Sequence, residues 1–447
     1  MNFFEKYVLP PAVKLGNQRH LLAIRDALVG MIAITMAGAF GTLLINLGQA
    51  VKGYDKIWES IFGPNWKMLG DDIWWGTLAF MTIFAVVGIA YKLARSYGDD
   101  GFEAMLVALA CYFILVPKVA TVTLTVDGKA VTGDAWGFIH WGYNNSTSLF
   151  SGIIVAIIAT EIFVRLSKLE KLKIKLPDGV PPAVSRSFEK LFPGMLTILI
   201  VGIIGVVFRQ FIADGAYFND WISKMLVTPL QNAADSLPFA IGISFFIHFF
   251  WMLGLHGPNI IGGVTTPLFL GLGTENNDMY IQGVTELSKY NIMAGPFFDA
   301  FVFLGGAGAS LGLLISMFIV SRKRHKQMLA LGLPPGVFQI NEPIIFGMPI
   351  VLNPIWAVPF VLTPIVLTIT SYLSIQFGLV HPVTLATMPW VTPPILGGWL
   401  ATGGHLSGAL LAAVNLVISI VIYLPFVIAQ NRIESKKLNK ASEELTV

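Results

Sequence analysis

The sequence is poor in charge and has almost no cysteine. Only 12% of its 447 residues are charged, against about 25% in a typical soluble domain. The single cysteine, Cys111, lies in an apolar run, so the chain can form neither an internal disulfide nor a cysteine-based metal site. A net charge of +3 is too small to indicate a nucleic-acid partner. These features exclude a disulfide-rich secreted scaffold, a cysteine-zinc domain and a nucleic-acid-binding protein.

Other common sequence features are also missing. There is no glycine-rich nucleotide-binding loop, so we expect no bound nucleotide and no cofactor. The N-terminal 26 residues are basic but lack the apolar core of a secretory signal peptide. We find no low-complexity segment and no repeat of fixed period.

What the sequence does contain is apolar residues, which make up 55% of the chain and raise its mean hydropathy to +0.71. This composition predicts an all-α polytopic membrane protein, because a spanning helix needs about 20 mostly apolar residues. The candidate spans cover 27–47, 74–93, 104–121, 149–165, 192–212, 238–256, 297–320, 354–378 and 405–428.

Clusters of lysine and arginine predict the orientation, since short basic loops stay in the cytoplasm. Basic residues concentrate at 165–190, in "SRKRHK" at 321–326, in the C-terminal tail and near the N-terminus. Both termini are therefore expected to be cytoplasmic. Alternation between the sides then requires one more crossing, near 259–272, and makes 334–353 and 380–404 re-entrant or flat. The total is about ten spans with re-entrant segments.

Three segments break the helical pattern at membrane depth: "GLHGPN" (254–259), "NEPIIFGMP" (341–349) and "TMPWVTPP" (387–394). Proline removes a backbone donor, and such breaks survive only where protein or a water-filled cavity covers them. Broken helices near the midplane are typical of a transporter's binding site. All three breaks lie in the second half of the chain. We therefore predict a plain helical half, 1–190, and a substrate-binding half, 191–447, in which 213–236 is an interfacial amphipathic segment.

Glu342 is the first candidate site residue. An ionised acid at the bilayer centre costs about 2.5–3.5 kcal/mol on insertion scales, so acids there usually serve function. It follows Asn341 directly and precedes a proline, inside the second break. The alternative is a structural acid that caps a broken helix or pairs with a basic loop.

His256 and Asn259 lie in the first break, among glycines that allow close approach to a ligand. A histidine that only meets interfacial water is the alternative. Trp251 and Trp390 could stack on a sugar ring, although tryptophan more often marks the membrane interface. Other polar positions in the spans are expected to be structural or are left open. His248 should be a core or helix-interface residue, and Glu161 should pair with Arg165 four residues later. Asp299 could either cap a helix or serve the site.

Long stretches of the sequence resemble the membrane-spanning EIIC component of bacterial phosphoenolpyruvate-dependent sugar phosphotransferase systems. The resemblance is carried by "FQINEPIIFGMPIVLNPIWAVPFV", "GLHGPN", "FFDAFVFLGGAGASLGLL" and "KLPDGVPPAVSRSFEKLFPG" and extends over nearly the whole chain. The branch it is most similar to is the lactose, cellobiose and N,N′-diacetylchitobiose family.

This resemblance implies ten spans, two re-entrant hairpins and a homodimer in the bacterial plasma membrane whose first half forms the dimer contact. It also implies that His256 and Glu342 lie beside the sugar hydroxyl that receives phosphate, and that Asn341, Trp251 and Trp390 belong to the pocket. The phosphoryl donor would be a phosphocysteine on a separate EIIB protein, itself charged by EIIA. The sugar would be a β-linked disaccharide, carried by an elevator-like motion.

Two other functions fit the same residues. In a proton-coupled disaccharide symporter, Glu342 and His256 would relay protons instead of orienting a hydroxyl. In a membrane receptor for secreted peptides, no sugar would bind at all. Uptake that depends on phosphoenolpyruvate and yields sugar phosphate distinguishes the first function from both.

Overall fold

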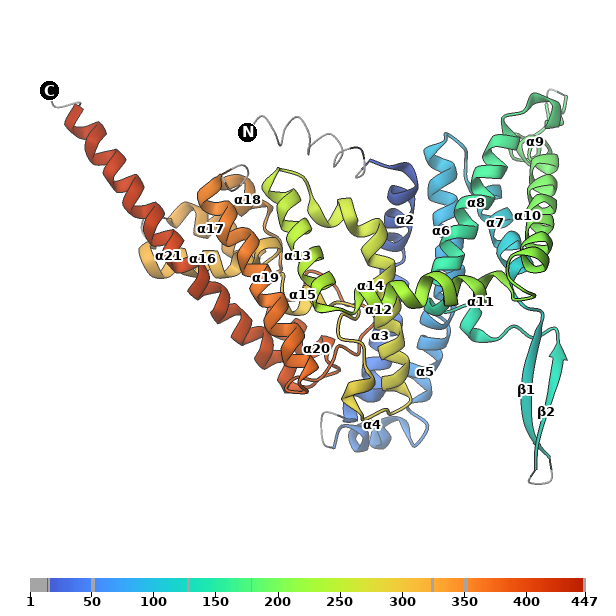
Figure 1. Cartoon of the computed structure of the whole chain (residues 1–447), viewed down its shortest axis with the longest axis horizontal. Coiled ribbons are helices and arrows are strands. Elements are labelled where there is room, and N and C mark those ends of the chain that lie inside the picture. The colour runs from blue at the N-terminus through green and yellow to red at the C-terminus, as the bar shows by residue number, and fades with distance from the viewer. Residues whose placement is uncertain are drawn as a thin grey trace.

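The structure is a computed structural model that describes residues 17–49, 53–126, 129–177, 179–322, 325–348 and 353–444, together with Lys14 and Ile350. Helices dominate it, as the composition predicts (Figure 1). Before Leu237 the chain contains α2 (Arg19–Gly30), α3 (Ile32–Asn46), α4 (Tyr54–Phe62), α5 (Met68–Trp75), α6 (Met81–Ser96), α7 (Phe102–Leu115), α8 (Leu149–Ser167), α9 (Pro182–Glu189), α10 (Leu191–Phe211), α11 (Phe218–Ile222) and α12 (Thr228–Ala234), the last three of which follow the predicted boundary at residue 190. The second half contains α13 (Leu237–Met252), α14 (Gly257–Ile281), α15 (Phe297–Phe301), α16 (Ser310–Ser321), α17 (Lys326–Val337), α18 (Glu342–Gly347), α19 (Pro354–Gln376), α20 (Pro394–Ala401) and α21 (Leu406–Glu444).

Several helices have the length and composition of membrane spans. Within the described residues, five single helical stretches qualify, and the number rises to seven if each of two bent pairs forms one span. These five are Met68–Ser96, Leu149–Ser167, Val184–Phe211, Ile355–Gln376 and Leu406–Ile433. The prediction of an all-helical membrane protein is therefore confirmed, while the total of ten spans and two re-entrant hairpins stays a prediction.

The segment predicted to lie at the membrane interface is helical. It comprises α11, a π-helical turn over Ser223–Val227 and α12. This stretch, Phe218–Ala234, is bent by 77° from α13. In Figure 1 it runs across the direction of the spans and connects the two halves of the molecule. That orientation suits a helix lying along a membrane surface.

One β-hairpin departs from the all-helical expectation. The predicted span 104–121 is too long, because α7 ends at Leu115, where Val116 is extended and Pro117 follows. Strands β1 (Val119–Val126) and β2 (Lys129–Trp136) then pair in antiparallel register, with Val119 opposite Trp136. The alternating valines and threonines of β1 have the period-2 pattern of a strand, which the hydropathy of the preceding helix hides. The hairpin extends away from the bundle (Figure 1).

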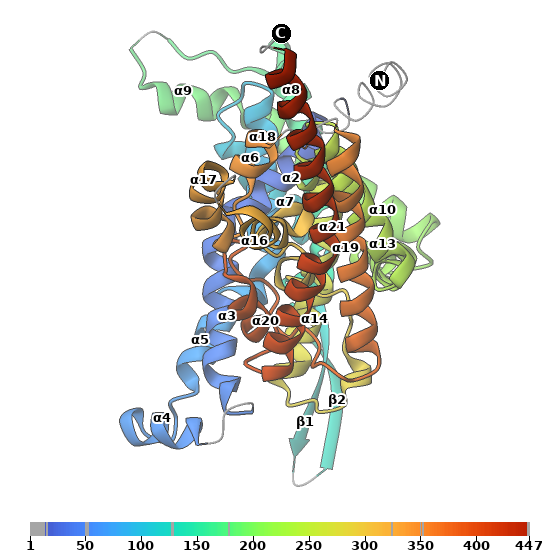
Figure 2. The same cartoon turned by 90° about the vertical axis from the view of Figure 1, so that its left-hand side faces the viewer.

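Buried side chains form several clusters, most members of which come from one part of the chain. The first core joins α2, α6, α7, α8 and α10 through residues such as Ile24, Val86, Tyr112, Ala156 and Val201. The second half has cores centred on the α15 and α20 region and on α16, α18 and α19. Helix α21 packs against both α16 and α19 (Figure 1 and Figure 2). The candidate site described below lies mostly among elements of the second half, with α2 and the start of α3 contributing to its lining.

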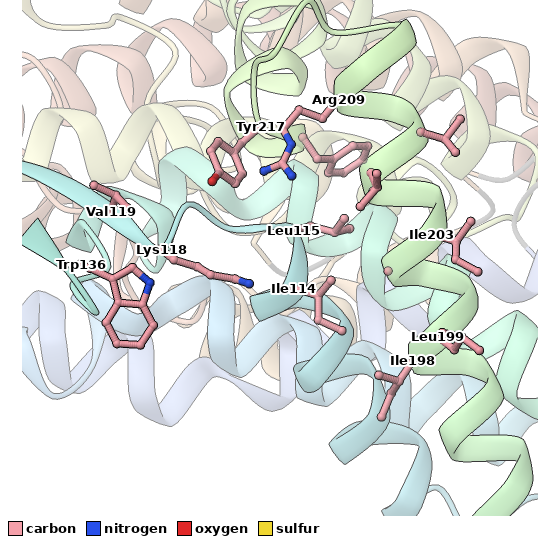
Figure 3. Close-up of a pocket in the computed structure, with 15 residues that line it drawn as sticks. Ile114, Leu115, Lys118, Val119, Trp136, Ile198, Leu199, Ile203, Arg209 and Tyr217 are labelled. Carbon is pink, nitrogen blue, oxygen red and sulfur yellow. The ribbon is translucent and has the colours of Figure 1, made fainter. Parts of the chain in front are cut away.

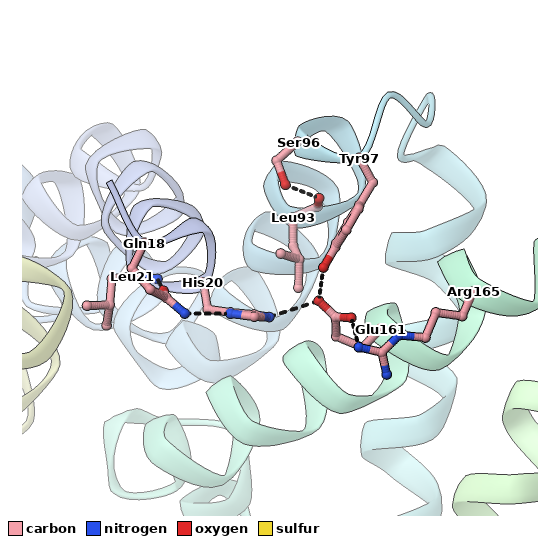
Figure 4. A network of polar contacts seen from close by, with 8 residues as sticks. All are labelled: Gln18, His20, Leu21, Leu93, Ser96, Tyr97, Glu161 and Arg165. Carbon is pink, nitrogen blue, oxygen red and sulfur yellow. Dashed lines mark hydrogen bonds and ion pairs between the residues drawn. The ribbon is translucent and has the colours of Figure 1, made fainter. Parts of the chain in front are cut away.

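A polar network ties three helices of the first half together (Figure 4). The predicted pair is confirmed, with Arg165 Nη2 lying 2.8 Å from Glu161 Oε2. The other carboxylate oxygen of Glu161 accepts a hydrogen bond from the Tyr97 hydroxyl at 2.5 Å and lies 2.8 Å from His20 Nε2. Glu161 is buried, so these partners replace the water that a carboxylate would otherwise need. The network therefore fixes the ends of α2, α6 and α8 relative to one another.

Candidate substrate-binding site

The break between α13 and α14 forms one wall of the site. Helix α13 ends at Met252, and Gly254 follows with φ of +80°, a backbone conformation that favours glycine. At Gly257 a Cβ atom would lie only 2.0 Å from the carbonyl oxygen of Ile247. A glycine is therefore required for α14 to start so close to α13.

His256 is held by its position at the start of α14. Its Nδ1 accepts a hydrogen bond from the backbone N–H of Asn259 at 3.3 Å, so the imidazole caps the helix. The ring lies against Trp251, with the two ring centroids 4.5 Å apart. Trp251 is buried, whereas His256 and Asn259 are exposed. The break therefore presents His256 and Asn259 on a rigid support.

The second wall comes from the loop between α15 and α16 and from the segment before α18. Gly306 has φ of +96°, and a Cβ there would lie 2.6 Å from Asn341 Cγ and 2.7 Å from the carbonyl oxygen of Gln339. The Asn341 amide donates to the carbonyl oxygen of Ala307 at 2.5 Å. These contacts lock the segment before α18 onto the loop after α15.

Gln339 connects this wall to a third one, the segment before α20. Its buried amide nitrogen donates to the backbone oxygens of Asp299, at 2.9 Å, and Thr392, at 2.8 Å. Thr392 lies two residues after Trp390, whose indole is about half exposed. The amide therefore joins the segment that holds Asn341 to α15 and to the segment that holds Trp390.

These walls enclose a cavity of about 470 Å³. Its lining brings together five of the six residues that the sequence predicted for the site: Trp251, His256, Asn259, Asn341 and Trp390. The sixth, Glu342, is the first residue of α18 and follows Asn341 directly. The side chain of Glu342 lies outside the described residues, so its part in the site stays a prediction.

Asp299 lines this cavity and also a second cavity of about 210 Å³. The two cavities share Pro258, Gly262, Thr266 and Phe303 as further lining residues. Within the described part of the chain, the Asp299 carboxylate has no hydrogen bond and no ion pair. The sequence left open whether Asp299 caps a helix or serves the site. The structure places it at the junction of the two cavities, where it can accept hydrogen bonds from a polar ligand.

Comparison with known proteins decides the family. Residues 25–364 match the family described as "Phosphotransferase system, EIIC". The chain belongs to this family. It is a membrane EIIC permease component, which transports sugar and leaves phosphoryl transfer to other components of the system.

Relatives of known name cover nearly the whole EIIC chain. It is 37% identical to the "Lichenan permease IIC component" of Bacillus subtilis over 426 residues, which are 94% of this chain and 91% of the relative. It is 36% identical to the "PTS system cellobiose-specific EIIC component" of Geobacillus stearothermophilus over 431 residues, 95% and 93% of the two chains. None of these similarities supports the alternative of a proton-coupled symporter.

A solved structure shares the fold of this EIIC chain. It is the crystal structure of the transporter ChbC, the IIC component from the N,N′-diacetylchitobiose-specific phosphotransferase system. The TM-score is 0.90 at 36% identity, and the match covers 97% of this chain and 99% of that one. The helical membrane fold inferred from composition is thus the fold of a known EIIC transporter.

Sequence reasoning missed three polar residues of this EIIC cavity: Arg25, Thr266 and Gln339. Arg25 on α2 lines it while its guanidinium contacts Asp26 Oδ1, 2.8 Å from Nε and 2.6 Å from Nη2. The sequence could have indicated Arg25, because placing a charged pair at the edge of an apolar span costs free energy and such residues usually serve function. Gln339 had no such signal, since a glutamine beside a proline-rich break resembles any loop residue.

His248 takes no part in the cavity, as its apolar surroundings in the sequence predicted. Its ring is fully buried between Phe303 and Phe360, with both centroid distances 5.6 Å. Its Nδ1 contacts the carbonyl oxygen of Ser244 at 2.6 Å. The prediction of a core histidine in this EIIC chain is confirmed.

Proposed function

We propose that this EIIC component binds a β-linked disaccharide in the cavity of about 470 Å³, carries it across the bacterial plasma membrane and presents it for phosphorylation by a separate, phosphorylated EIIB protein. The observation that supports the proposal most is the gathering of Trp251, His256, Asn259, Asn341 and Trp390 around one cavity. Relatives named for cellobiose, lichenan and diacetylchitobiose favour a disaccharide of the cellobiose or chitobiose type over lactose.

The chemistry of the lining suits a sugar. The C–H face of a pyranose ring is apolar and packs on indole, while the hydroxyl groups need hydrogen-bond partners. Trp251 and Trp390 provide the aromatic surfaces, and Asn259, His256 and the Asp299 carboxylate provide polar groups. The volume lies within the range of about 300–1,000 Å³ that small-molecule sites occupy.

His256 and Glu342 are proposed to act on the reacting hydroxyl. Phosphoryl transfer depends mostly on positioning and on stabilising charge. The imidazole of His256 would orient the hydroxyl, and the carboxylate of Glu342 would accept its proton as the oxygen attacks the phosphorus of phosphorylated EIIB. EIIB would in turn receive its phosphoryl group from EIIA.

We further propose that the basic loops and both termini face the cytoplasm. Helix α9 and the C-terminal end of α21 lie at one end of the bundle, whereas α4 and the β-hairpin lie at the other (Figure 1). The basic residues at 165–190 gather at the α9 end, as the rule for cytoplasmic loops requires.

Cysteine labelling in intact cells tests this orientation. Cys111 is fully buried, so the native cysteine should add little background labelling. A membrane-impermeant maleimide should label Asp134→Cys in the hairpin of intact cells and should label Lys171→Cys only after lysis. The reverse pattern would contradict the proposed sidedness.

The working unit is proposed to be a homodimer in which the first half forms the contact. Helix α10 packs against α7 and α8 and adds Val201 to the core of the first half. We therefore propose that the functional boundary falls after α10, rather than at residue 190. Mass measurement of the detergent-solubilised protein would reveal a dimer, and a monomer at all concentrations would contradict it.

Titration calorimetry of the purified protein with cellobiose, N,N′-diacetylchitobiose, lactose and maltose tests the substrate class. We expect binding of a β-linked sugar and none of maltose. In membrane vesicles, uptake should require phosphoenolpyruvate and the soluble components and should yield sugar phosphate. Accumulation of free sugar that uncouplers abolish would contradict the proposal.

A further inference from the structure

Two histidines from different parts of the second half stack face to face. His381 follows α19, and His405 lies in the turn between α20 and α21. Their ring centroids are 3.9 Å apart, and their ring planes differ by only 5°. We refer to them as the histidine pair. It lines neither the candidate substrate cavity nor the cavity of about 820 Å³ beside α10 (Figure 3).

The histidine pair lies where α19 ends and α21 begins, at the end of the bundle away from α9 (Figure 1). Under the proposed orientation this end faces the outside of the cell. Both histidines lie just outside the stretches that qualify as spans, Ile355–Gln376 and Leu406–Ile433. Both are partly exposed, so protons from the outer solution can reach the rings.

The other titratable side chains that contact the pair are tyrosines. Tyr280 at the end of α14 and Tyr290 in the loop that follows lie with their ring centroids 6.3 Å and 5.9 Å from that of His381. Nδ1 of His381 lies 3.0 Å from the carbonyl oxygen of Pro382. Within the described part of the chain, neither imidazole makes an ion pair or a hydrogen bond with a carboxylate. A proton on either ring would therefore have no acid to compensate it.

The stack is most stable while both rings are neutral. Burial lowers the pKa of both imidazoles, and the neighbouring His381 helps to lower that of His405 to about 4. A second proton would place two like charges at stacking distance. Once the rings separate into water, each binds a proton with the ordinary histidine pKa of about 6.5. Acid therefore favours the separated form, by up to about tenfold per imidazole for each pH unit below that value.

His381 begins the chain segment that reaches the candidate substrate site. Within this segment, Thr387 lines the cavity of about 210 Å³ and Trp390 lines the cavity of about 470 Å³. The backbone N–H of His381 donates to the hydroxyl of Ser407 at 3.1 Å, so the segment starts against the first turn of α21. The stack with His405 is a second contact at the same place. Separating the two rings therefore loosens the start of the segment that carries Trp390.

We propose that the histidine pair is a pH-sensitive switch. With both rings neutral it holds segment 381–390 in its sugar-binding position, and protonation from the outer side separates the rings and weakens sugar binding. Tyrosine stays neutral over the range in which histidine titrates, so the two imidazoles carry the response. The effect on sugar binding rests on the proposed function of the cavity, whereas separation of the rings does not.

Hydrogen exchange of the purified full-length protein, measured by mass spectrometry at pH 7.5 and pH 5.5, tests the switch without sugar. After correction for the intrinsic exchange rate, the amides of 381–390 should exchange roughly tenfold faster at pH 5.5. His405→Phe keeps a flat ring against His381 but cannot bind a proton, so it should lose most of this acceleration. His405→Gln removes the ring and should exchange fast at both pH values. His140→Gln is the control, because His140 is exposed and contacts Trp141 and Tyr143 instead.

Calorimetric titration with the β-linked disaccharides at the same two pH values tests the effect on the site. On going to pH 5.5, the dissociation constant should rise by about threefold or more in the wild type relative to His405→Phe. His256 is present in both proteins, so the difference between them isolates the histidine pair. Equal acceleration of exchange in the wild type and His405→Phe, or an equal loss of affinity, would overturn the proposal. Absence of sugar binding at pH 7.5 would instead contradict the proposed function, and the exchange rates would still decide whether the rings separate.

Discussion

The indole of Trp251 and the imidazole of His256 lie with their ring centroids 4.5 Å apart, across the break that separates α13 from α14. The tryptophan is buried in the core next to α16 and α18, and the histidine faces the cavity. A residue of the hydrophobic core thus supports a polar residue of the site directly.

Trp251→Phe should weaken disaccharide binding without unfolding the protein. An aromatic ring remains, but the larger indole surface against His256 and the sugar is lost. Aromatic contacts of this kind are worth about 0.5–1.5 kcal/mol, so the dissociation constant should rise up to about tenfold. Calorimetric titration measures it. Trp75→Phe is the control, because Trp75 is exposed and does not line the cavity. Equal sugar affinities of the two variants would show that Trp251 does not contribute to the site.

Glu342→Gln should reduce phosphorylation more than sugar binding. The amide keeps the size of the side chain but cannot accept a proton, and loss of a general base typically costs about 10²–10⁴-fold in rate. The rate of sugar phosphate formation with purified phosphorylated EIIB measures the effect, and calorimetry measures binding. Glu286→Gln provides a matched change, since Glu286 lies in a loop and pairs with Lys289. Normal turnover in Glu342→Gln would exclude the proposed base.

Gly306→Ala should destabilise the site. The new Cβ would clash with Asn341 Cγ and the carbonyl oxygen of Gln339, and the left-handed backbone adds strain of about 1–3 kcal/mol. Gly283→Ala separates the two effects, because Gly283 also has positive φ but no atom within 4 Å of the added Cβ. The melting temperature and the sugar affinity should both fall further in Gly306→Ala than in Gly283→Ala. Equal melting temperatures and equal sugar affinities of the two variants would show that the close approach at Gly306 is not structurally important.

Glu161→Gln should loosen the first half. The buried carboxylate contacts Arg165, His20 and Tyr97, and hydrogen bonds to a charged group contribute about 1.5–3 kcal/mol each. We expect a lower melting temperature in detergent, with sugar affinity unchanged. Tyr97→Phe removes one of these hydrogen bonds, so its melting temperature should lie between those of the wild type and Glu161→Gln. A melting temperature of Glu161→Gln equal to that of the wild type would contradict this account.

Much of the site could be found from the sequence because its breaks are local. A proline or glycine in an apolar run disturbs a helix whatever the rest of the chain does. The segments around His256, Asn341 and Trp390 could therefore be predicted from the sequence. The Glu161–Arg165 pair was equally accessible, because residues four apart on a helix are neighbours. The end of α7 was missed, since hydropathy continues through Val116 while the backbone becomes extended.

The sequence by itself determined the class of protein, because a chain with so few charges and so many apolar residues is stable only in a bilayer, and it determined where the helices break. Only the tertiary structure decided which breaks meet. It brought Asp299, Gln339 and Arg25 into contact with one cavity from distant parts of the chain, through hydrogen bonds such as those from Gln339 to the backbone of Asp299 and Thr392. Such contacts depend on how helices pack, and packing is set by the shape of many side chains together rather than by any local pattern.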